Sequence, residues 1–182
     1  MLVLSVLIAI GLVVGALTAL GGRSGLSAPT LEPSGIGTVR FGLTKLKAVA
    51  ELSDLFGAPS ARGVNTGCGP RYTEVEWGNL AAEFRLNKFS GYRYMEGGYP
   101  FNITTPRRFP VKPGVPSLTT SKRITLGSTL AELRTASRVL RSDGTDKWRS
   151  ADGVVFVDSA KHDPIPPSSR IVEIKIGTCG DF

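Results

Sequence analysis

Residues that could build a metal or catalytic centre are scarce in this sequence. Its 182 residues include a single histidine, His162, and two cysteines, Cys68 and Cys179. A zinc site needs three or four Cys, His or carboxylate ligands, and the Gly-x-Ser-x-Gly turn of α/β-hydrolases does not occur. The pair Gly35-x-Gly37 lacks the third glycine of a dinucleotide-binding loop. We therefore predict no metal site and no cofactor, and we assign no catalytic residue.

Acidic residues are missing from one long stretch. No Asp or Glu lies between Gly97 and Ala131, although the chain as a whole carries a net charge of +7. The stretch contains five cations, which are Arg107, Arg108, Lys112, Lys122 and Arg123. It has neither the dense basic helix nor the interleaved aromatics of nucleic-acid-binding proteins, so we expect no nucleic-acid partner. Two interpretations stay open, namely contact with an anionic envelope surface and a solvated loop.

Charge is also missing from the first twenty residues, whose only polar side chains are Ser5 and Thr18. A uniformly apolar run of this length is typical of a membrane span. A cleaved signal peptide would begin with basic residues, but no Lys or Arg precedes Arg23. We therefore predict that residues 2–20 form one helix that acts as an uncleaved single-pass anchor, with secretion after cleavage as the alternative. Both interpretations place the rest of the protein outside the cytoplasm.

Cysteine usage agrees with export. An even cysteine count behind an export leader favours a disulfide over free thiols. We therefore predict a bond between Cys68 and Cys179; the alternative is a lone reactive thiol at Cys68.

Two similar strand-to-helix junctions divide the remaining chain. The sequence Phe41-Gly42-Leu43-Thr44 is echoed by Leu126-Gly127-Ser128-Thr129, and each threonine is suited to cap a helix. Apolar spacing predicts helices over Lys45–Phe56 and Leu130–Leu140, each followed by about three strands. These patterns predict an α+β fold of two tandem β-α-β-β-β units with antiparallel sheets, preceded by an N-terminal hydrophobic helix.

The expected boundaries follow from composition. We predict a hydrophobic leader or membrane anchor over residues 1–22, a flexible tether over 23–34, a first α+β unit over 35–98, a Pro-rich basic linker over 99–120 and a second unit over 121–182.

The tandem plan and the turns "FGLTKLKAV" and "LGSTLAEL" resemble the β-lactamase inhibitory protein family and related exported actinobacterial proteins of unknown function. In that family two repeats each open with a Gly-Met-Thr-type turn that leads into a helix ahead of an antiparallel sheet. This sequence has Leu43 and Ser128 where Met is common, and one pair of cysteines where the inhibitor has a pair per repeat. The resemblance implies the tandem arrangement, and no enzyme-contacting residue carries over from it.

Aromatic and basic residues supply the candidate binding surface, because Tyr, Trp and Arg are enriched at the energetic centres of interfaces. Tyr92 and Tyr94 share one face of a predicted strand, and further aromatic and basic residues follow in the next segment. The predicted patch comprises Tyr92, Tyr94, Tyr99, Phe101, Arg107 and Arg108.

These features favour a non-enzymatic binding or interaction module of the cell envelope, with a protein or an envelope surface as its partner. The alternative is a small extracytoplasmic hydrolase in which His162 works with an acidic neighbour, Asp158 or Asp163. The competing interpretation of His162 is an exposed residue in a Pro-rich loop.

Overall fold

The computed structural model describes residues 28–65, 72–97, 117–141, 146–160 and 164–177. The predicted helix over residues 2–20 and the predicted bond between Cys68 and Cys179 lie outside these ranges. Within them, no helix is both long enough and apolar enough to cross a bilayer.

The described residues form twelve strands and two helices. In chain order they are β1 (Thr30–Glu32), β2 (Gly35–Ile36), β3 (Val39–Arg40), α1 (Lys45–Phe56), β4 (Ala61–Asn65), β5 (Tyr72–Trp77), β6 (Leu80–Arg85), β7 (Lys88–Met95), β8 (Thr119–Thr120), α2 (Leu130–Ala136), β9 (Val139–Arg141), β10 (Lys147–Ser150), β11 (Val155–Asp158) and β12 (Ile171–Ile176).

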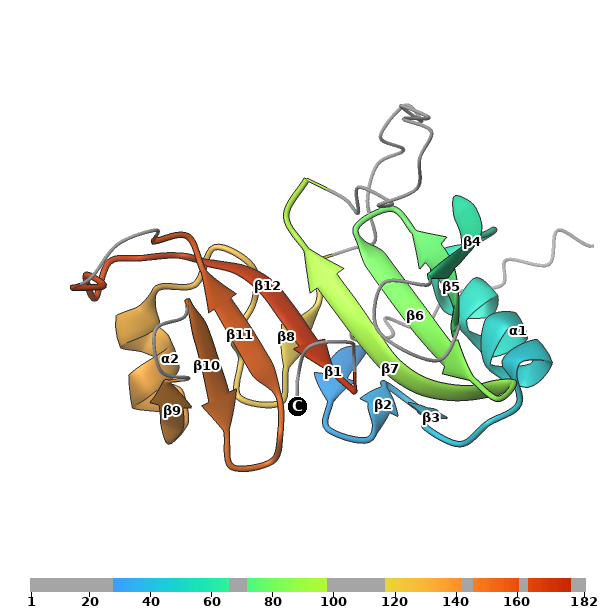
Figure 1. Ribbon diagram of the computed structural model, residues 1–182, viewed down its shortest axis with the longest axis horizontal. Helices are drawn as coiled ribbons and strands as arrows, with labels where there is room; N and C mark the ends of the chain where they lie inside the picture. Colours follow the sequence, from blue (N-terminus) through green and yellow to red (C-terminus); the bar gives the residue numbers. More distant parts are fainter. Residues whose placement is uncertain (1–27, 66–71, 98–116, 142–145, 161–163, 178–182) are drawn as a thin grey trace, which may run out of the picture.

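The strands build two sheets. The larger has eight strands in the order β4-β5-β6-β7-β12-β11-β10-β9, and the smaller has four in the order β3-β2-β1-β8. All neighbours in the large sheet are antiparallel, whereas β1 and β8 pair in parallel. The two helices lie toward opposite ends of the molecule, and β7 and β12 lie between them (Figure 1).

This architecture corrects the predicted fold class. The protein is mostly β, with one eight-stranded sheet, one four-stranded sheet and only two short helices among the described residues, and the prediction of an α+β fold of two tandem β-α-β-β-β units is wrong. The meanders that follow the two helices join into one sheet because β7 pairs with β12. Strands at a free edge expose unpaired backbone groups, and this pairing removes two such edges.

Several element boundaries also differ from the predictions. Helix α2 ends at Ala136 rather than Leu140, because Ser137 turns extended and Val139 pairs with Ser150 in the next strand. The strand expected to open the second β-α-β-β-β unit does not form over residues 123–127, and β8 lies just before them. Strand β1 falls within the segment that we expected to be a flexible tether, so part of that segment is ordered. The domain boundaries themselves stay a prediction.

The echoed junctions have the same hydrogen bonds. The Gly42 amide donates to the Phe89 carbonyl at 2.8 Å, and the Gly127 amide donates to the Ile171 carbonyl, also at 2.8 Å. Both glycines have left-handed backbone, with φ of +89° and +84°, which glycine adopts at little cost. Each junction therefore fixes the start of a helix to the last strand of the meander that follows it.

Threonine caps complete both junctions. Thr44 accepts a bond from the Lys47 amide at 3.4 Å, and Thr129 accepts one from the Glu132 amide at 3.2 Å. At Thr129 the Glu132 carboxylate also accepts from the cap amide at 2.7 Å, which makes a full capping box. The recurring Gly-x-Thr in the sequence thus corresponds to a recurring way of docking a helix onto the sheet.

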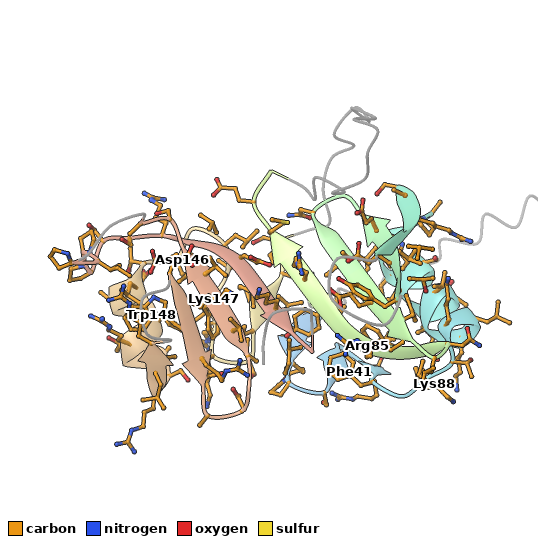
Figure 2. All side chains as sticks on the ribbon, viewed as in Figure 1. Phe41, Arg85, Lys88, Asp146, Lys147 and Trp148 are labelled. Carbon is orange, nitrogen blue, oxygen red and sulfur yellow. The ribbon has the colours of Figure 1, made fainter. Side chains whose placement is uncertain are left out.

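One face of the large sheet and both helices share a hydrophobic core. Helix α1 contributes Ala48 and Leu52, while Leu46, in its first turn, is 84% exposed. The sheet contributes Val75, Trp77, Leu80, Ala82, Phe84, Phe89, Tyr92, Tyr94, Trp148, Phe156 and Ile174. The core reaches toward both ends of the molecule, with Phe41 toward the α1 end and Trp148 beside α2 (Figure 2).

Two tyrosines from the predicted binding patch lie in this core. Tyr92 and Tyr94 are 0% and 3% exposed. The Tyr94 hydroxyl accepts a bond from the Leu118 amide at 3.2 Å, whereas the Tyr92 hydroxyl has no hydrogen-bond partner among the described residues. Burial raises the pKa of Tyr92 well above its ordinary value. Neither ring is available to a partner, so the predicted patch fails at these two positions.

Loss of the hydroxyl should lower the stability of the protein at Tyr94 but not at Tyr92. Tyr94→Phe leaves the buried Leu118 amide unpaired and should lower the free energy of unfolding by about 1–2 kcal/mol. Tyr92→Phe removes a buried hydroxyl that lacks a partner, so stability should stay the same or rise by about 1 kcal/mol. Urea unfolding of the two variants and the wild type checks both values. Equal losses in both variants would contradict this account of the core.

Candidate functional site

The face of the large sheet opposite the core carries charged side chains. Alternate residues of a strand point to opposite sides, and the register aligns Glu76 with Ala81, Arg93 and Lys175 across four strands. We call this surface the charged face and define it by Glu74, Glu76, Glu83, Arg93, Glu173 and Lys175.

Most of these charges are buried. Glu74, Glu76, Glu83 and Lys175 are each at most 5% exposed, and the Arg93 side chain is 14% exposed. Ionised side chains are rarely buried to this degree without partners, because leaving water costs several kcal/mol per ion. The charged face is therefore the most electrostatically unusual part of the described structure.

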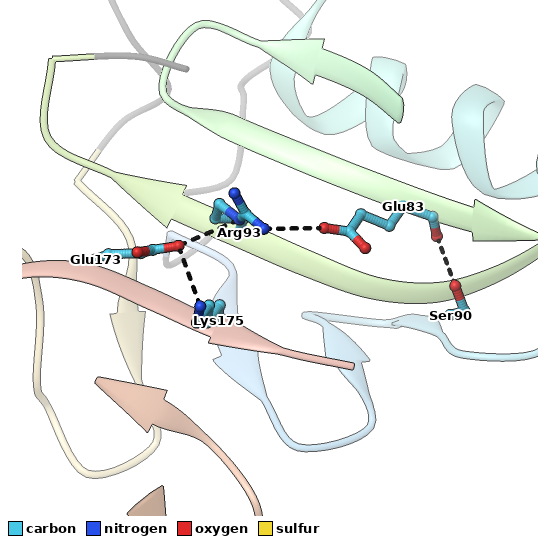
Figure 3. A network of polar contacts seen from close by, with 5 residues as sticks. All are labelled: Glu83, Ser90, Arg93, Glu173 and Lys175. Carbon is cyan, nitrogen blue, oxygen red and sulfur yellow. Dashed lines mark hydrogen bonds and ion pairs between the residues drawn. The ribbon is translucent and has the colours of Figure 1, made fainter. Parts of the chain in front are cut away.

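Arg93 is the centre of an ion-pair network at the seam between the two meanders (Figure 3). Its Nη2 lies 3.7 Å from Glu83 Oε1 on β6, and its Nε lies 3.2 Å from Glu173 Oε1 on β12. The Lys175 Nζ is 3.9 Å from the same Glu173 oxygen. The network thus ties together β6, β7 and β12, including the one strand pair that joins the two halves of the sheet.

The acidic end of the charged face lies on β5 and β6. Glu74 is directly opposite Glu83 in the strand register, and Glu76 follows two residues later on the same side of β5. Burial, followed by the neighbouring Glu74 carboxylate, raises the pKa of Glu76 to about 8. Glu76 is therefore mainly protonated at neutral pH, which relieves repulsion in this end and provides a buried proton donor.

The opposite end of the charged face is basic and reaches solvent. Register continues the row from Lys175 through Val155 to Arg149 on β10, and Arg149 is exposed. Lys147 lies two residues earlier on the same side and is half-buried. The face thus grades from buried carboxyl groups at β5 and β6 to accessible cations at β10.

The remaining predicted site residues are placed as follows. Asp158, the suggested partner of His162, is 2% exposed; its carboxylate accepts bonds from Trp148 Nε1 at 2.7 Å and from the Ala160 amide at 2.7 Å. Asp158 thus holds β10 and its own turn together. Outside the described residues lie Tyr99, Phe101, Arg107, Arg108, Cys68, Cys179, His162 and Asp163.

Among the residues that the structure describes, no three His, Cys, Asp or Glu side chains are grouped so that they could hold a metal ion. The carboxyl groups of the charged face are instead spread over β5, β6 and β12, with Glu74 opposite Glu83 and Arg93 opposite Lys175 in the register. This arrangement suits recognition of charged groups and storage of a proton.

The charged face was missed by the sequence analysis, although its signal was present. In "TEVEW" and "VEIK" charged and apolar residues alternate, a pattern typical of a strand with one solvated side. Strand alternation does place these residues on one side, but it does not reveal that the side is buried.

No family model matches the chain, and no curated protein matches it. A crystal structure of the uncharacterized protein YfeY from Escherichia coli is similar over 82% of this chain and 99% of that one, with 13% sequence identity and a TM-score of 0.45. This similarity is too low to assign a fold or a function. The resemblance to the β-lactamase inhibitory protein family stays a prediction.

Removal of Arg93 should destabilise the fold strongly. Arg93→Ala leaves the buried Glu83 carboxylate without this cation, so the free energy of unfolding should fall by about 3–5 kcal/mol. The matched control is Lys47→Ala, which breaks the exposed ion pair to Glu51 at 3.9 Å and should cost at most about 0.5 kcal/mol. Denaturant titration of both variants measures the difference. Similar small losses would show that the seam network contributes little.

Glu76 should make stability depend on pH. Its pKa is raised from 4.5 to about 8 on folding, so the folded state binds more protons than the unfolded state between these values. The contribution of Glu76 to the free energy of unfolding is therefore complete below pH 4.5. It falls as pH rises toward 8, with a slope of at most about 1.4 kcal/mol per pH unit. Glu76→Gln should flatten this fall, while Asp54→Asn, on the exposed side of α1, should not. Melting temperatures across this range test the sign, and a rise in wild-type stability from pH 5 to 8 that Glu76→Gln abolishes would contradict it.

Proposed function

We propose that the protein is an exported or membrane-anchored binding module of the cell envelope and that the charged face provides its recognition surface. The observation that carries this proposal is the charge gradient along that face, from buried carboxyl groups at Glu74 and Glu76 to the exposed Arg149. Replacing buried ion pairs by apolar residues often leaves stability unchanged or raises it. A row of buried charges that does not stabilise the fold is therefore better explained by recognition of a partner than by a structural role.

The accessible end of the face indicates the chemistry of the partner. Arg149 is exposed and Lys147 beside it is half-buried, and cations of this kind pair with carboxylates or phosphates. The network at Arg93 connects β6, β7 and β12, and β11 lies between β12 and the strand that carries Arg149. We propose an acidic protein segment as the partner, in keeping with the predicted interaction module and with the family that the turn motifs resemble.

The extracytoplasmic location and the single-pass anchor in residues 2–20 belong to the same proposal and rest on the apolar leader. The hydrolase alternative has less support, because Asp158 is already bonded to Trp148 and to a backbone amide and so is not free to orient His162.

Charge reversal tests the recognition surface. The full chain with a photo-crosslinker near β10 is expected to capture a discrete acidic protein from envelopes of the source cells. Arg149→Glu should abolish this capture, because it places a like charge against the partner. Lys122→Glu makes the same charge change on an exposed residue after β8 that lies near Phe156, on the core side of the sheet, and should retain it.

Two results would count against the proposal. Equal capture by both variants would exclude Arg149 from the contact, and the absence of any saturable product with the wild type would remove the binding role itself.

A further inference from the structure

Two leucines are exposed at the same end of the molecule. Leu86, in the turn between β6 and β7, is 97% exposed, and Leu46, in the first turn of α1, is 84% exposed. The Lys45 amide donates to the Asn87 carbonyl at 2.9 Å. Each leucine is adjacent in sequence to one partner of this bond, so the two belong to one local surface. We call it the hairpin end.

The apolar character of the hairpin end extends to the edge of the sheet. Val64 on β4 is opposite Thr73 on β5, which is opposite Phe84 on β6. Phe84 lies two residues before Leu86 of the β6–β7 turn. Val64 is 52% exposed. Three aliphatic side chains thus face solvent at this end, and the fold gains little from burying any of them.

Leu86 also occupies an unfavourable backbone conformation. It has φ of +47° and Asn87 has φ of +60°, the left-handed pair that a two-residue hairpin turn requires. Asparagine accepts this conformation readily, but leucine does not. A leucine that is both exposed and left-handed contributes nothing evident to folding, and such outliers are grounds for a functional hypothesis.

Cations surround these leucines. Lys45 and Lys47 flank Leu46 in the sequence. Arg85, whose guanidinium lies 5.7 Å from the centre of the Tyr72 ring, precedes Leu86, and Lys88 follows the turn (Figure 2). Lys45 Nζ lies 5.8 Å from the centre of the Phe84 ring, so its stem follows apolar surface while its charge stays near solvent. Glu51, which pairs with Lys47, offsets one of the four positive charges.

We propose that the hairpin end docks on the surface of an anionic lipid bilayer. Leu46 and Leu86 would enter the boundary between headgroups and acyl chains, and the surrounding cations would pair with lipid phosphates. Exposed aliphatic residues ringed by Lys and Arg are the combination that binds such interfaces, whereas protein hot spots are enriched in Trp, Tyr and Arg. The predicted leader would hold the domain near a bilayer, and this surface is separate from the charged face.

A tryptophan placed at the tip reports the contact directly. The full chain carrying Leu86→Trp is reconstituted into vesicles of brominated phosphatidylcholine with phosphatidylglycerol, and into brominated phosphatidylcholine alone. Trp77 and Trp148 are 3% and 5% exposed and give a constant background, subtracted with the wild type. We expect blue-shifted emission and strong bromine quenching from the new tryptophan only when phosphatidylglycerol is present.

The matched control is Leu140→Trp. Leu140 is 74% exposed on the edge strand β9, at the far end of the sheet, and it also has arginine neighbours. Its tryptophan should remain unquenched in both vesicles. Quenching equal to that at position 86 would overturn the proposal, because it would show non-specific proximity to lipid rather than docking by the hairpin end.

A second pair of variants tests the role of charge and guards against a disturbed turn. Leu46→Trp should behave like Leu86→Trp. In the Leu86→Trp and the Leu46→Trp proteins, adding Lys45→Gln or Lys88→Gln should lower the ratio of docked to undocked protein about fivefold. The melting temperature should stay nearly the same. If neither reporter is quenched in anionic vesicles, lipid is not the occupant and the proposal fails. Saturable binding of a soluble protein at the same tryptophans would then identify a protein partner instead.

Discussion

The pairing of β7 with β12 is the contact on which the rest of this structure depends. It joins two four-stranded meanders into one sheet and leaves no free edge between them. The approach is close: a Cβ added at Gly177 would lie 2.2 Å from the Ser90 carbonyl oxygen, and one at Gly91 would lie 2.6 Å from the Ile176 carbonyl oxygen. Any larger residue at either position would force the strands apart. The backbone at the seam therefore requires glycine on both sides.

The seam also brings the charges of the Arg93 network together. Arg93 can reach Glu83 and Glu173 together only because β6, β7 and β12 are consecutive strands of one sheet. Without that pairing Arg93 on β7 and Glu173 on β12 would lie on edge strands. The same row of residues continues to Arg149, so the proposed recognition surface takes its position from the seam as well.

The two proposed surfaces use different physics. The charged face depends on a fixed arrangement of ions held by strand register, and its partner must supply opposite charge. The hairpin end depends on aliphatic side chains at a turn. They do not stabilise the fold there, but their insertion would stabilise binding to a lipid interface. One molecule can therefore bind a partner through the sheet while its end rests on a bilayer.

Local structure in this protein follows from residues close together in the chain. The Gly-x-Thr junctions, the start of each helix and the strands over residues 72–95 follow from capping, glycine and alternation, which act between near neighbours in the chain. The end of α2, the strands β1 and β4, and the burial of Tyr92 and Glu83 were decided by tertiary structure. Alternation shows which residues share a side of a strand, but contacts between segments far apart in the chain decide which strands become neighbours and which sides are covered. The pairing of β7 with β12 is such a contact, and it brings Glu173 within reach of Arg93.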